Sequence, residues 1–284
     1  MNKIKLIADS TCDLSPELIQ RHNISIIPLY VNLGDASRRD GVDVTVQELF
    51  DYTAKTKQTP KTAAISIVDY QEAFAPWIDA GCDILFVGIS SMLSSTVANA
   101  VIAAQDFPAG RIEVVDSMNL STGIGHLVLR AGELIEQGMA LADIASHLRQ
   151  TAPKVRASFV IDTLLYLYRG GRCSALQAFG ANALSLKPSI VVADGSMRPD
   201  KKYRGNIVRC AERYAADVLI AAAGTADRKH VFITHTPCDP EIVQAVKSVV
   251  ETSGLFEQIH ETDAGAVIAS HCGPNTIGVL YVEK

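Results

Sequence analysis

The stretch Asp83-Ile84-Leu85-Phe86-Val87-Gly88-Ile89 is one of the longest apolar runs in the chain. Seven residues suit a buried strand and fall far short of the roughly 20 that a membrane-spanning helix needs. Ser90-Ser91-Met92-Leu93-Ser94-Ser95-Thr96 follows at once, and a helical pattern covers 94–106. An apolar strand that leads through a polar turn into a helix is typical of a parallel sheet covered by helices. The stretch therefore predicts a central strand of an α/β fold.

The same alternation extends outward from this strand in both directions. Ser15-Pro16-Glu17 has the composition of a helix start, with Ser15 as N-cap and Pro16 at the first helical position. Apolar strands are predicted at 4–8, 24–33, 111–115 and 155–161, and helical spacing at 46–53, 70–78, 121–137 and 141–150. The first half therefore predicts a Rossmann-like, mostly parallel sheet with helices on both faces.

The second half has a different pattern. Pro188–Asp194 and Met197–Tyr203 flank Gly195-Ser196, which predicts a β-hairpin. Helices over 206–222 and 240–252 and strands over 230–235, 256–262 and 276–282 follow. This order predicts an α+β unit with a mixed or antiparallel sheet. At about 150 residues per domain, 284 residues suit two domains, which we expect at 1–155 (α/β) and 156–284 (α+β).

Composition excludes several classes of protein. Hydrophobic residues make up 48% and charged residues 20%, so a disordered chain is excluded. The net charge of −5 disfavours nucleic acid, and also an anionic membrane surface as the main partner. Six scattered cysteines without a C-x-x-C pair, and a start unlike a signal peptide, predict a cytoplasmic protein with no metal site. The mean hydropathy of +0.17 with only 6% aromatic residues indicates a small aliphatic interior, either a tight core or a lined cavity.

Common catalytic signatures are absent from the sequence. Gly88-Ile89-Ser90-Ser91-Met92 lacks the second glycine of a nucleophile elbow, and Gly123-Ile124-Gly125-His126-Leu127-Val128 lacks the third glycine of a dinucleotide fingerprint. A phosphate-binding P-loop and a zinc-type H-E-x-x-H pattern are also missing. The sequence therefore predicts a protein without a cofactor.

Hydroxyl residues gather after the predicted strands. Asp9, Ser10, Thr11, Asp116 and Ser117 are interpreted as helix caps and turn residues. The run 90–96 has more hydroxyls than one helix start requires, which favours an anion site there. Gly170-Gly171-Arg172 is typical of a helix C-cap followed by an exposed arginine, and His271 is predicted in a loop over 270–275.

Taken together, a set of ordered segments resembles the DegV family, whose best-understood members are the fatty-acid-binding subunits of bacterial fatty acid kinase. The segments are Ala8-Asp9-Ser10-Thr11-Cys12-Asp13-Leu14, Ile27-Pro28-Leu29, Asp40-Gly41-Val42-Asp43, Ser90-Ser91-Met92-Leu93-Ser94, Val115-Asp116-Ser117, Leu167-Tyr168-Arg169-Gly170-Gly171-Arg172, Lys187-Pro188 and Ser270-His271-Cys272-Gly273-Pro274. The resemblance implies a two-domain fold around a long-chain fatty acid, with the tail in an apolar tunnel and the carboxylate where the domains meet.

By motif position, the resemblance implies that Thr62, Ser94 and His271 hold the carboxylate, with Ser66 and Ser95 as further candidates. Thr62-Ala63-Ala64-Ile65-Ser66 stands where the family has Thr-Ser-Gln-Pro-Ser, Leu93-Ser94-Ser95-Thr96-Val97 where it has Leu-Ser-Gly-Thr-Tyr, and Gly273-Pro274-Asn275 where it has Gly-Pro-Gly. These departures retain the carboxylate donors and change the pocket wall.

The resemblance also implies a non-catalytic carrier that presents the bound acid to a separate fatty acid kinase. Arg172 is the docking candidate by motif, and Arg169 and Arg204 are basic residues expected near the portal. Such a carrier allows transient contact with membrane lipid. The small residues of 175–183 either leave tunnel space or pack closely on a sheet.

Two other functions stay open from the residues alone. Ser94 as nucleophile with His271 as base would suit a serine hydrolase or acyltransferase, with Asp263 or Asp116 as orienting carboxylate. The predicted fold class would also suit a sugar- or nucleotide-binding protein.

Overall fold

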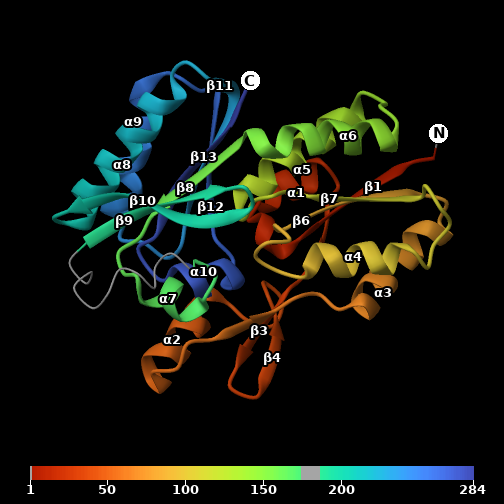
Figure 1. Ribbon diagram of the computed structural model, residues 1–284, viewed down its shortest axis with the longest axis horizontal. Coiled ribbons are helices and arrows are strands. Elements are labelled where there is room, and N and C mark those ends of the chain that lie inside the picture. The colour runs from red at the N-terminus through yellow and green to blue at the C-terminus, as the bar shows by residue number, and fades with distance from the viewer. Residues whose placement is uncertain (1, 174–185) are drawn as a thin grey trace.

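A parallel sheet forms one side of the molecule (Figure 1). The computed structural model describes residues 2–173 and 186–284. The sheet contains β1 (Ile4–Asp9), β2 (Ser25–Ile27), β6 (Asp83–Gly88) and β7 (Ile112–Asp116), in the order β2-β1-β6-β7. All three pairings are parallel. The stretch at 83–89 is therefore a central strand, as predicted.

Helices cover both faces of this sheet, and alternate side chains of each strand face opposite helix layers. On one face, Ile7 of β1 packs with side chains of α3 (Ile67–Asp79) and α4 (Thr96–Ala104). On the other face, Leu6 and Ala8 pack with α5 (Thr122–Glu136) and α6 (Leu141–Thr151). The prediction of a parallel sheet covered on both sides is confirmed. The short helix α1 (Pro16–Arg21) begins at Ser15, whose side chain accepts the Leu18 N–H as predicted.

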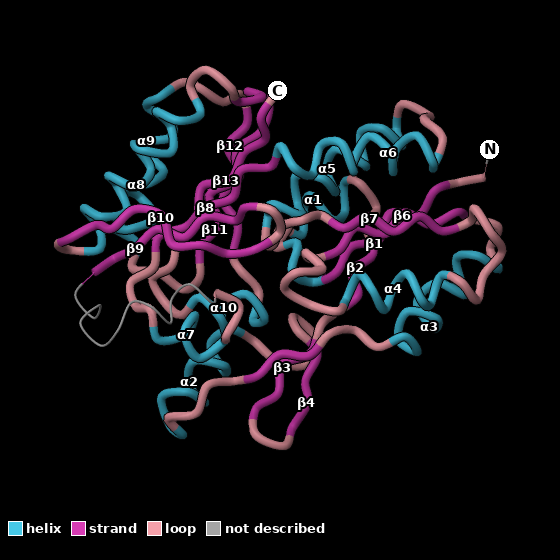
Figure 2. Tube along the Cα trace, in the orientation of Figure 1, coloured by secondary structure: helices cyan, strands magenta, loops and turns pink. Residues whose placement is uncertain are grey.

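A six-stranded mixed sheet forms the other side, on the left of Figure 2. Its order is β10-β9-β8-β13-β11-β12, and only β11 and β12 pair in parallel. The strands are β8 (Val155–Val160), β9 (Leu186–Ala193), β10 (Ser196–Arg204), β11 (Ala226–His235), β12 (Gln258–Asp263) and β13 (Ile277–Glu283). Two helices, α8 (Ile207–Ala222) and α9 (Pro240–Ser253), pack on one face, and α5 lies against the other. The predicted hairpin is present, with positive φ at Asp194 and Gly195.

A third sheet, of order β4-β3-β5, was not foreseen. It contains β3 (Tyr30–Leu33), β4 (Ala36–Arg39) and β5 (Lys61–Ala63), all antiparallel. The prediction of one strand over 24–33 was wrong. Pro28 has no N–H for a sheet ladder, and the chain leaves the parallel sheet after Ile27 and enters the third sheet at Tyr30.

Three helices lie beside this small sheet: α2 (Val46–Thr56), α7 (Leu165–Gly170) and α10 (Ala266–Cys272). Two short 3-10 turns, η1 (Ser10–Cys12) and η2 (Ala152–Lys154), complete the described elements. Of these helices, α10 packs on α7, α2, β3, β5 and η1.

One hydrophobic cluster joins the two large sheets. It contains Leu6 and Leu85 of the parallel sheet, Ile124 of α5, and Phe159 and Leu280 of the mixed sheet. The division into 1–155 and 156–284 stays a prediction, and this cluster crosses it. The small residues predicted at 175–183 lie outside the described residues. Within 2–173 and 186–284, no helix combines the length and apolarity needed to cross a membrane.

Candidate functional site

Three side chains from distant parts of the chain line one pocket. Thr62 belongs to β5, Ser94 to the turn between β6 and α4, and His271 to the last turn of α10. His271 was predicted in a loop, which was wrong for Ser270–Cys272. Small and apolar residues continue the helix from Ala266, and Gly273, with φ of +79°, ends it.

Thr62 and His271 form a direct hydrogen bond. Thr62 Oγ1 lies 2.9 Å from His271 Nε2, while Nδ1 is buried and has no hydrogen-bond partner among the described residues. If Nδ1 carried the ring proton, its buried N–H would have no acceptor, which costs more free energy than a buried unprotonated nitrogen without a donor. The ring proton therefore belongs on Nε2, which donates to Thr62 Oγ1, and the Thr62 hydroxyl can donate to a further acceptor.

The His271 ring is neutral at ordinary pH. Burial, together with the positive charge of Arg172, lowers the pKa of His271 to about 4. A neutral imidazole fixes the orientation of the Thr62 hydroxyl and adds no permanent charge to the pocket. This arrangement can bind an anion through directed hydrogen bonds.

Gly170 leaves the space that the His271 ring occupies. A Cβ atom at residue 170 would overlap His271 Nδ1, so a larger residue requires the ring to move. The predicted C-cap is confirmed, because Gly171 ends α7 with φ of +69°. Arg172 lines the pocket, and its Nη1 donates to Gly170 O. The packing role of Gly170 was missed, although a doubled glycine before an arginine was the signal that could have indicated it.

Ser94 is held by the turn that precedes α4. Its backbone N–H donates to Ser90 O, and its hydroxyl lies 2.8 Å from Thr96 Oγ1. The Ser90 hydroxyl donates to Gly195 O in the β9–β10 hairpin. This hydrogen bond therefore connects the β9–β10 hairpin of the mixed sheet to the turn that carries Ser94.

The two additional serines lie outside this pocket lining. Ser66 is the N-cap of α3 and exchanges hydrogen bonds with Asp69 in a capping box. Ser95 is exposed at the start of α4, and its side chain makes no capping bond. Their assignment as ligands stays a prediction.

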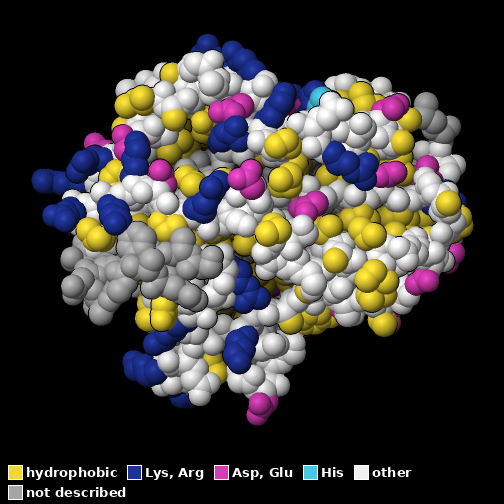
Figure 3. Space-filling view, in the orientation of Figure 1, with side chains coloured by type: hydrophobic (Ala, Val, Ile, Leu, Met, Phe, Trp, Pro, Cys, Tyr) yellow, Lys and Arg dark blue, Asp and Glu magenta, His cyan; other side chains and the backbone are white. Residues whose placement is uncertain are grey.

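The other two predicted arginines are exposed on separate elements. Arg169, at the end of α7, donates to Thr59 Oγ1. Arg204 ends β10, which also exposes Arg198, Lys201 and Lys202. Basic side chains gather in Figure 3 at the left end of the visible face, over the β9–β10 hairpin and α8.

Ser94 and His271 do not form a catalytic pair in this geometry. His271 Nε2 bonds Thr62, and its Nδ1 meets no carboxylate among the described residues. Asp263 is exposed and lies beside His235, and Asp116 accepts the N–H groups of Ser91 and Met118. The base and the orienting carboxylate of a triad are therefore not supported.

The pocket is small and its inner wall is apolar. Described residues enclose about 50 Å³, below the roughly 300–1,000 Å³ of typical small-molecule sites. A second cavity of about 30 Å³ shares Leu120, Ile268 and Cys272 with it and extends to Ala157 and Leu280 of the mixed sheet. The two cavities trace an apolar path from the hydroxyls toward the joint core. The apolar side chains of the pocket are Leu29, Ile89, Leu93, Leu120, Met197, Val267 and Ile268.

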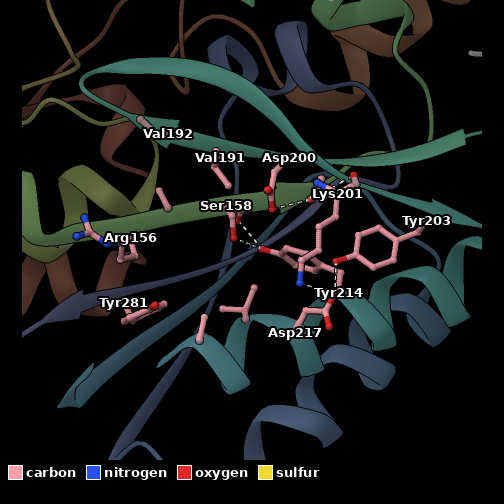
Figure 4. A pocket seen from close by; sticks show the side chains of 14 residues that line it. Arg156, Ser158, Val191, Val192, Asp200, Lys201, Tyr203, Tyr214, Asp217 and Tyr281 are labelled. Carbon is pink, nitrogen blue, oxygen red and sulfur yellow. Dashed lines mark hydrogen bonds and ion pairs between the residues drawn. The ribbon is translucent and has the colours of Figure 1, made fainter. Parts of the chain in front are cut away.

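A larger cavity, of about 210 Å³, lies on the opposite side of the mixed sheet (Figure 4). Its polar groups bond one another: Ser158 Oγ lies 2.9 Å from the Tyr214 hydroxyl, and Asp217 accepts bonds from Tyr203 and Lys201. It contains none of the predicted site residues. Within 2–173 and 186–284, no three His, Cys, Asp or Glu side chains are arranged to hold a metal ion.

Comparison with known proteins gives consistent matches over the whole chain. A DegV domain-containing protein of Caldanaerobacter subterraneus is 31% identical over 284 residues, which cover all of both chains. A solved DegV family protein of Thermus thermophilus, described by its fatty acid binding, is 34% identical, with a TM-score of 0.90 over 99% of this chain and 100% of that one. A solved stearic-acid-binding protein of Eubacterium ventriosum is 26% identical, with a TM-score of 0.82 over 100% and 99%. A family model described as "Uncharacterised protein, DegV family" matches residues 3–284, and the chain therefore belongs to the DegV family.

Proposed function

We propose that this protein binds a long-chain fatty acid and holds its carboxylate at Thr62, Ser94 and His271. The observation that carries the proposal is the Thr62–His271 hydrogen bond in a pocket that also contains Ser94 and has an apolar inner wall. The hydroxyls of Thr62 and Ser94 can donate hydrogen bonds to the carboxylate. These bonds matter because burial of a carboxylate without hydrogen-bond donors has a large free-energy cost. The fatty acid binding of the similar Thermus thermophilus protein supports the same ligand class.

The acyl tail follows the apolar path between the two cavities. Burial of an acyl chain contributes about 0.8 kcal/mol per CH₂, so a long chain favours an apolar interior. Because the cavities at Leu120 and Ile268 are small, these side chains separate to admit the tail. This step joins ligand binding to the core that connects the two sheets.

The bound acid is presented to a separate fatty acid kinase in the cytoplasm. Such a partner supplies the phosphoryl-transfer groups, for which this sequence has no recognised signature. Arg172 and Arg169 lie at the end of α7, which exposes Leu165 and Tyr168, and an arginine beside exposed apolar groups suits a protein interface. Arg204 extends the basic surface on β10.

Mass spectrometry of ligand extracted from the denatured protein tests the first proposal. We expect a fatty acid in near-stoichiometric amount, and tight binding of added oleate by the delipidated protein. Recovery of polar metabolites alone, without binding of added oleate, would refute fatty acid binding.

Phosphorylation assays with a fatty acid kinase catalytic subunit test the partner. Arg169→Glu and Arg204→Glu should reduce acyl phosphate formation without a change in oleate affinity, because neither residue lines the pocket. Arg172 is a poorer probe, because it lines the pocket and is also exposed at the proposed docking surface, so its replacement could change both oleate binding and kinase docking. Unchanged phosphorylation in both variants would remove these arginines from the interface.

A further inference from the structure

Three buried carboxylates lie behind the site, and the proposed function uses none of them. Asp9 and Asp13 belong to the first quoted motif of the family resemblance, and Asp40 begins another. All three are almost fully buried, and none takes part in an ion pair between described residues. Buried carboxylates require hydrogen-bond donors, and their donors show what they hold in place.

Asp13 binds the start of α10. Its Oδ1 accepts the Gly265 N–H at 2.8 Å, and its Oδ2 accepts the Ser121 hydroxyl. Ser121 directly precedes α5. Asp13 therefore links the first strand's turn, α5 and α10.

Asp40 binds the next donors of the same helix. Its Oδ1 accepts the Ala266 N–H at 2.8 Å, and the Val267 N–H lies close enough to favour the charged form of this carboxylate. Its Oδ2 accepts the Ser10 hydroxyl, which in turn accepts the Leu29 N–H. The first N–H groups of α10, which have no partner inside the helix, thus bond two carboxylates from other segments.

Gly265 permits this close approach. A Cβ atom at residue 265 would lie 3.2–3.3 Å from oxygens of Asp40 and Asp13. Gly265 has no side chain to cap its own helix, and the two aspartates take that role. A carboxylate near a helix N-terminus also interacts favourably with the helix dipole.

The other end of α10 carries His271. The helix spans seven residues, so it is about 10 Å long and short enough to transmit a shift of its first turn to its last. His271 Nε2 must stay within bonding distance of Thr62 Oγ1 in β5, and its ring fills the space beside Gly170. A small displacement of α10 breaks both contacts.

We propose that Asp13 and Asp40 are positioning residues for the carboxylate site, and that they act through α10 by holding His271 against Thr62. The inference rests on the proposed function for its binding readout. Asp9 holds another segment of the pocket lining, because its Oδ2 accepts the N–H of Ile89, just before the turn that carries Ser94.

Oleate titration of a double-mutant cycle tests this inference. Asp40→Ala should weaken oleate binding about tenfold, the scale expected for loss of a hydrogen bond to a charged group. In a His271→Ala background the same change should weaken binding by less than about twofold, because its effect passes through His271. Asp13→Ala should behave alike, and Asp40→Asn, which retains an acceptor for Ala266 N–H, should recover most of the affinity.

A matched control removes a cap from a helix without a site residue. Asn206→Ala deletes the side chain that accepts Val208 N–H at the start of α8. It should lower stability without changing oleate affinity. The ¹⁵N signal of His271 Nε2, assigned through His271→Gln, should shift in Asp40→Ala but stay close to its original position in Asp40→Asn and Asn206→Ala.

The outcomes separate the two proposals. Equal loss of affinity in both backgrounds, or no loss in either, overturns the positioning role and leaves fatty acid binding intact. If the unaltered protein does not bind oleate, the proposed function fails, and the His271 signal alone decides positioning: a shift supports it and an unchanged signal overturns it. If Asp40→Ala does not fold, the same comparisons with Asp13→Ala decide.

Discussion

In the proposed site, neither Thr62 nor His271 carries a permanent charge. The imidazole orients the hydroxyl, and the low pKa of His271 keeps the ring neutral. A fixed cation bonded to a carboxylate would hold it more strongly and would compete for the oxygen that a phosphoryl donor must reach. Neutral donors at Thr62 and His271 would therefore suit a site that binds an acid and later releases it, and the Arg172 guanidinium of the same lining donates to Gly170 O.

Ser94 should contribute one donor to the bound carboxylate. Ser94→Ala removes this donor while the turn keeps its backbone bond from Ser94 N–H to Ser90 O. We expect oleate binding to weaken by roughly 1.5–3 kcal/mol with the fold unchanged, measured by calorimetric titration. Ser91→Ala, at an exposed position of the same turn, is the control and should bind as before. Equal affinities of Ser94→Ala and the unaltered protein would remove Ser94 from the site.

The site residues could be selected from the sequence only through ordered motifs. Thr62 and His271 are 209 positions apart, and no local pattern relates them. Capping roles were predictable, and Asp9 and Asp116 do accept nearby backbone N–H groups. The hydrogen bonds that Asp13 and Asp40 accept from the start of α10, more than 200 residues away, were not predictable. Hydrogen bonds between distant segments leave no periodic pattern in the sequence.

At the scale of elements, apolar periodicity located most strands and helices. It failed where one apolar run serves two sheets, because residues 24–33 look continuous and only Pro28 marks the break. It also failed at α10, where the glycine and proline after Cys272 suggested a loop. In both places the structure depends on contacts with other segments: β3 pairs with β4 and β5, and the start of α10 bonds Asp13 and Asp40.

Helix α5, which lies between the two large sheets, carries a histidine that should make stability depend on pH. His126 Nε2 bonds Leu280 O, and its ring packs on Phe232. Burial lowers the pKa of His126 to about 4, and its titratable neighbours are His230, His260 and Asp227. Because the unfolded chain takes up this proton below about pH 6.5, the stabilisation from neutral His126 is present above that pH and is lost as pH falls toward 4.

Urea unfolding at pH 7 and pH 4.5 checks this expectation. The unaltered protein should lose about 2–3 kcal/mol more between these pH values than His126→Leu. The comparison of variants isolates His126 from Asp9, whose pKa burial raises to about 6 and whose contribution has the opposite sign. Equal losses in the two proteins would show that His126 is not held neutral.

At the scale of the whole molecule, the aliphatic interior is closely packed in its described part. The two cavities on the proposed tail path total far less volume than a typical ligand site. Composition left a tight core and a lined cavity as alternatives, and it could not distinguish them because both use the same side chains. Within residues 2–173 and 186–284, an acyl chain would thus replace contacts between the walls, because the described cavities form no preformed tunnel.

The depth of the tail path should therefore limit acyl chain length. Ala157 lines the second cavity and is buried on β8. Ala157→Leu should weaken stearate binding more than octanoate binding, because only the longer chain reaches this depth. Calorimetric titration with saturated acids of increasing length measures the effect. Ala221→Leu, which fills the separate cavity of Figure 4, should leave the length preference unchanged, and a uniform loss for all chain lengths in Ala157→Leu would exclude this path.

The aspartate contacts of α10 also have a consequence for biosynthesis. Ala266 follows Asp40 by 226 residues, and at about 5–20 residues per second a ribosome needs roughly 11–45 s to make that length. During this interval the Asp13 and Asp40 carboxylates have no helix to bind and remain hydrated. The nascent N-terminal half therefore completes its interior, and gains the Thr62–His271 contact, only after nearly the whole chain has been translated.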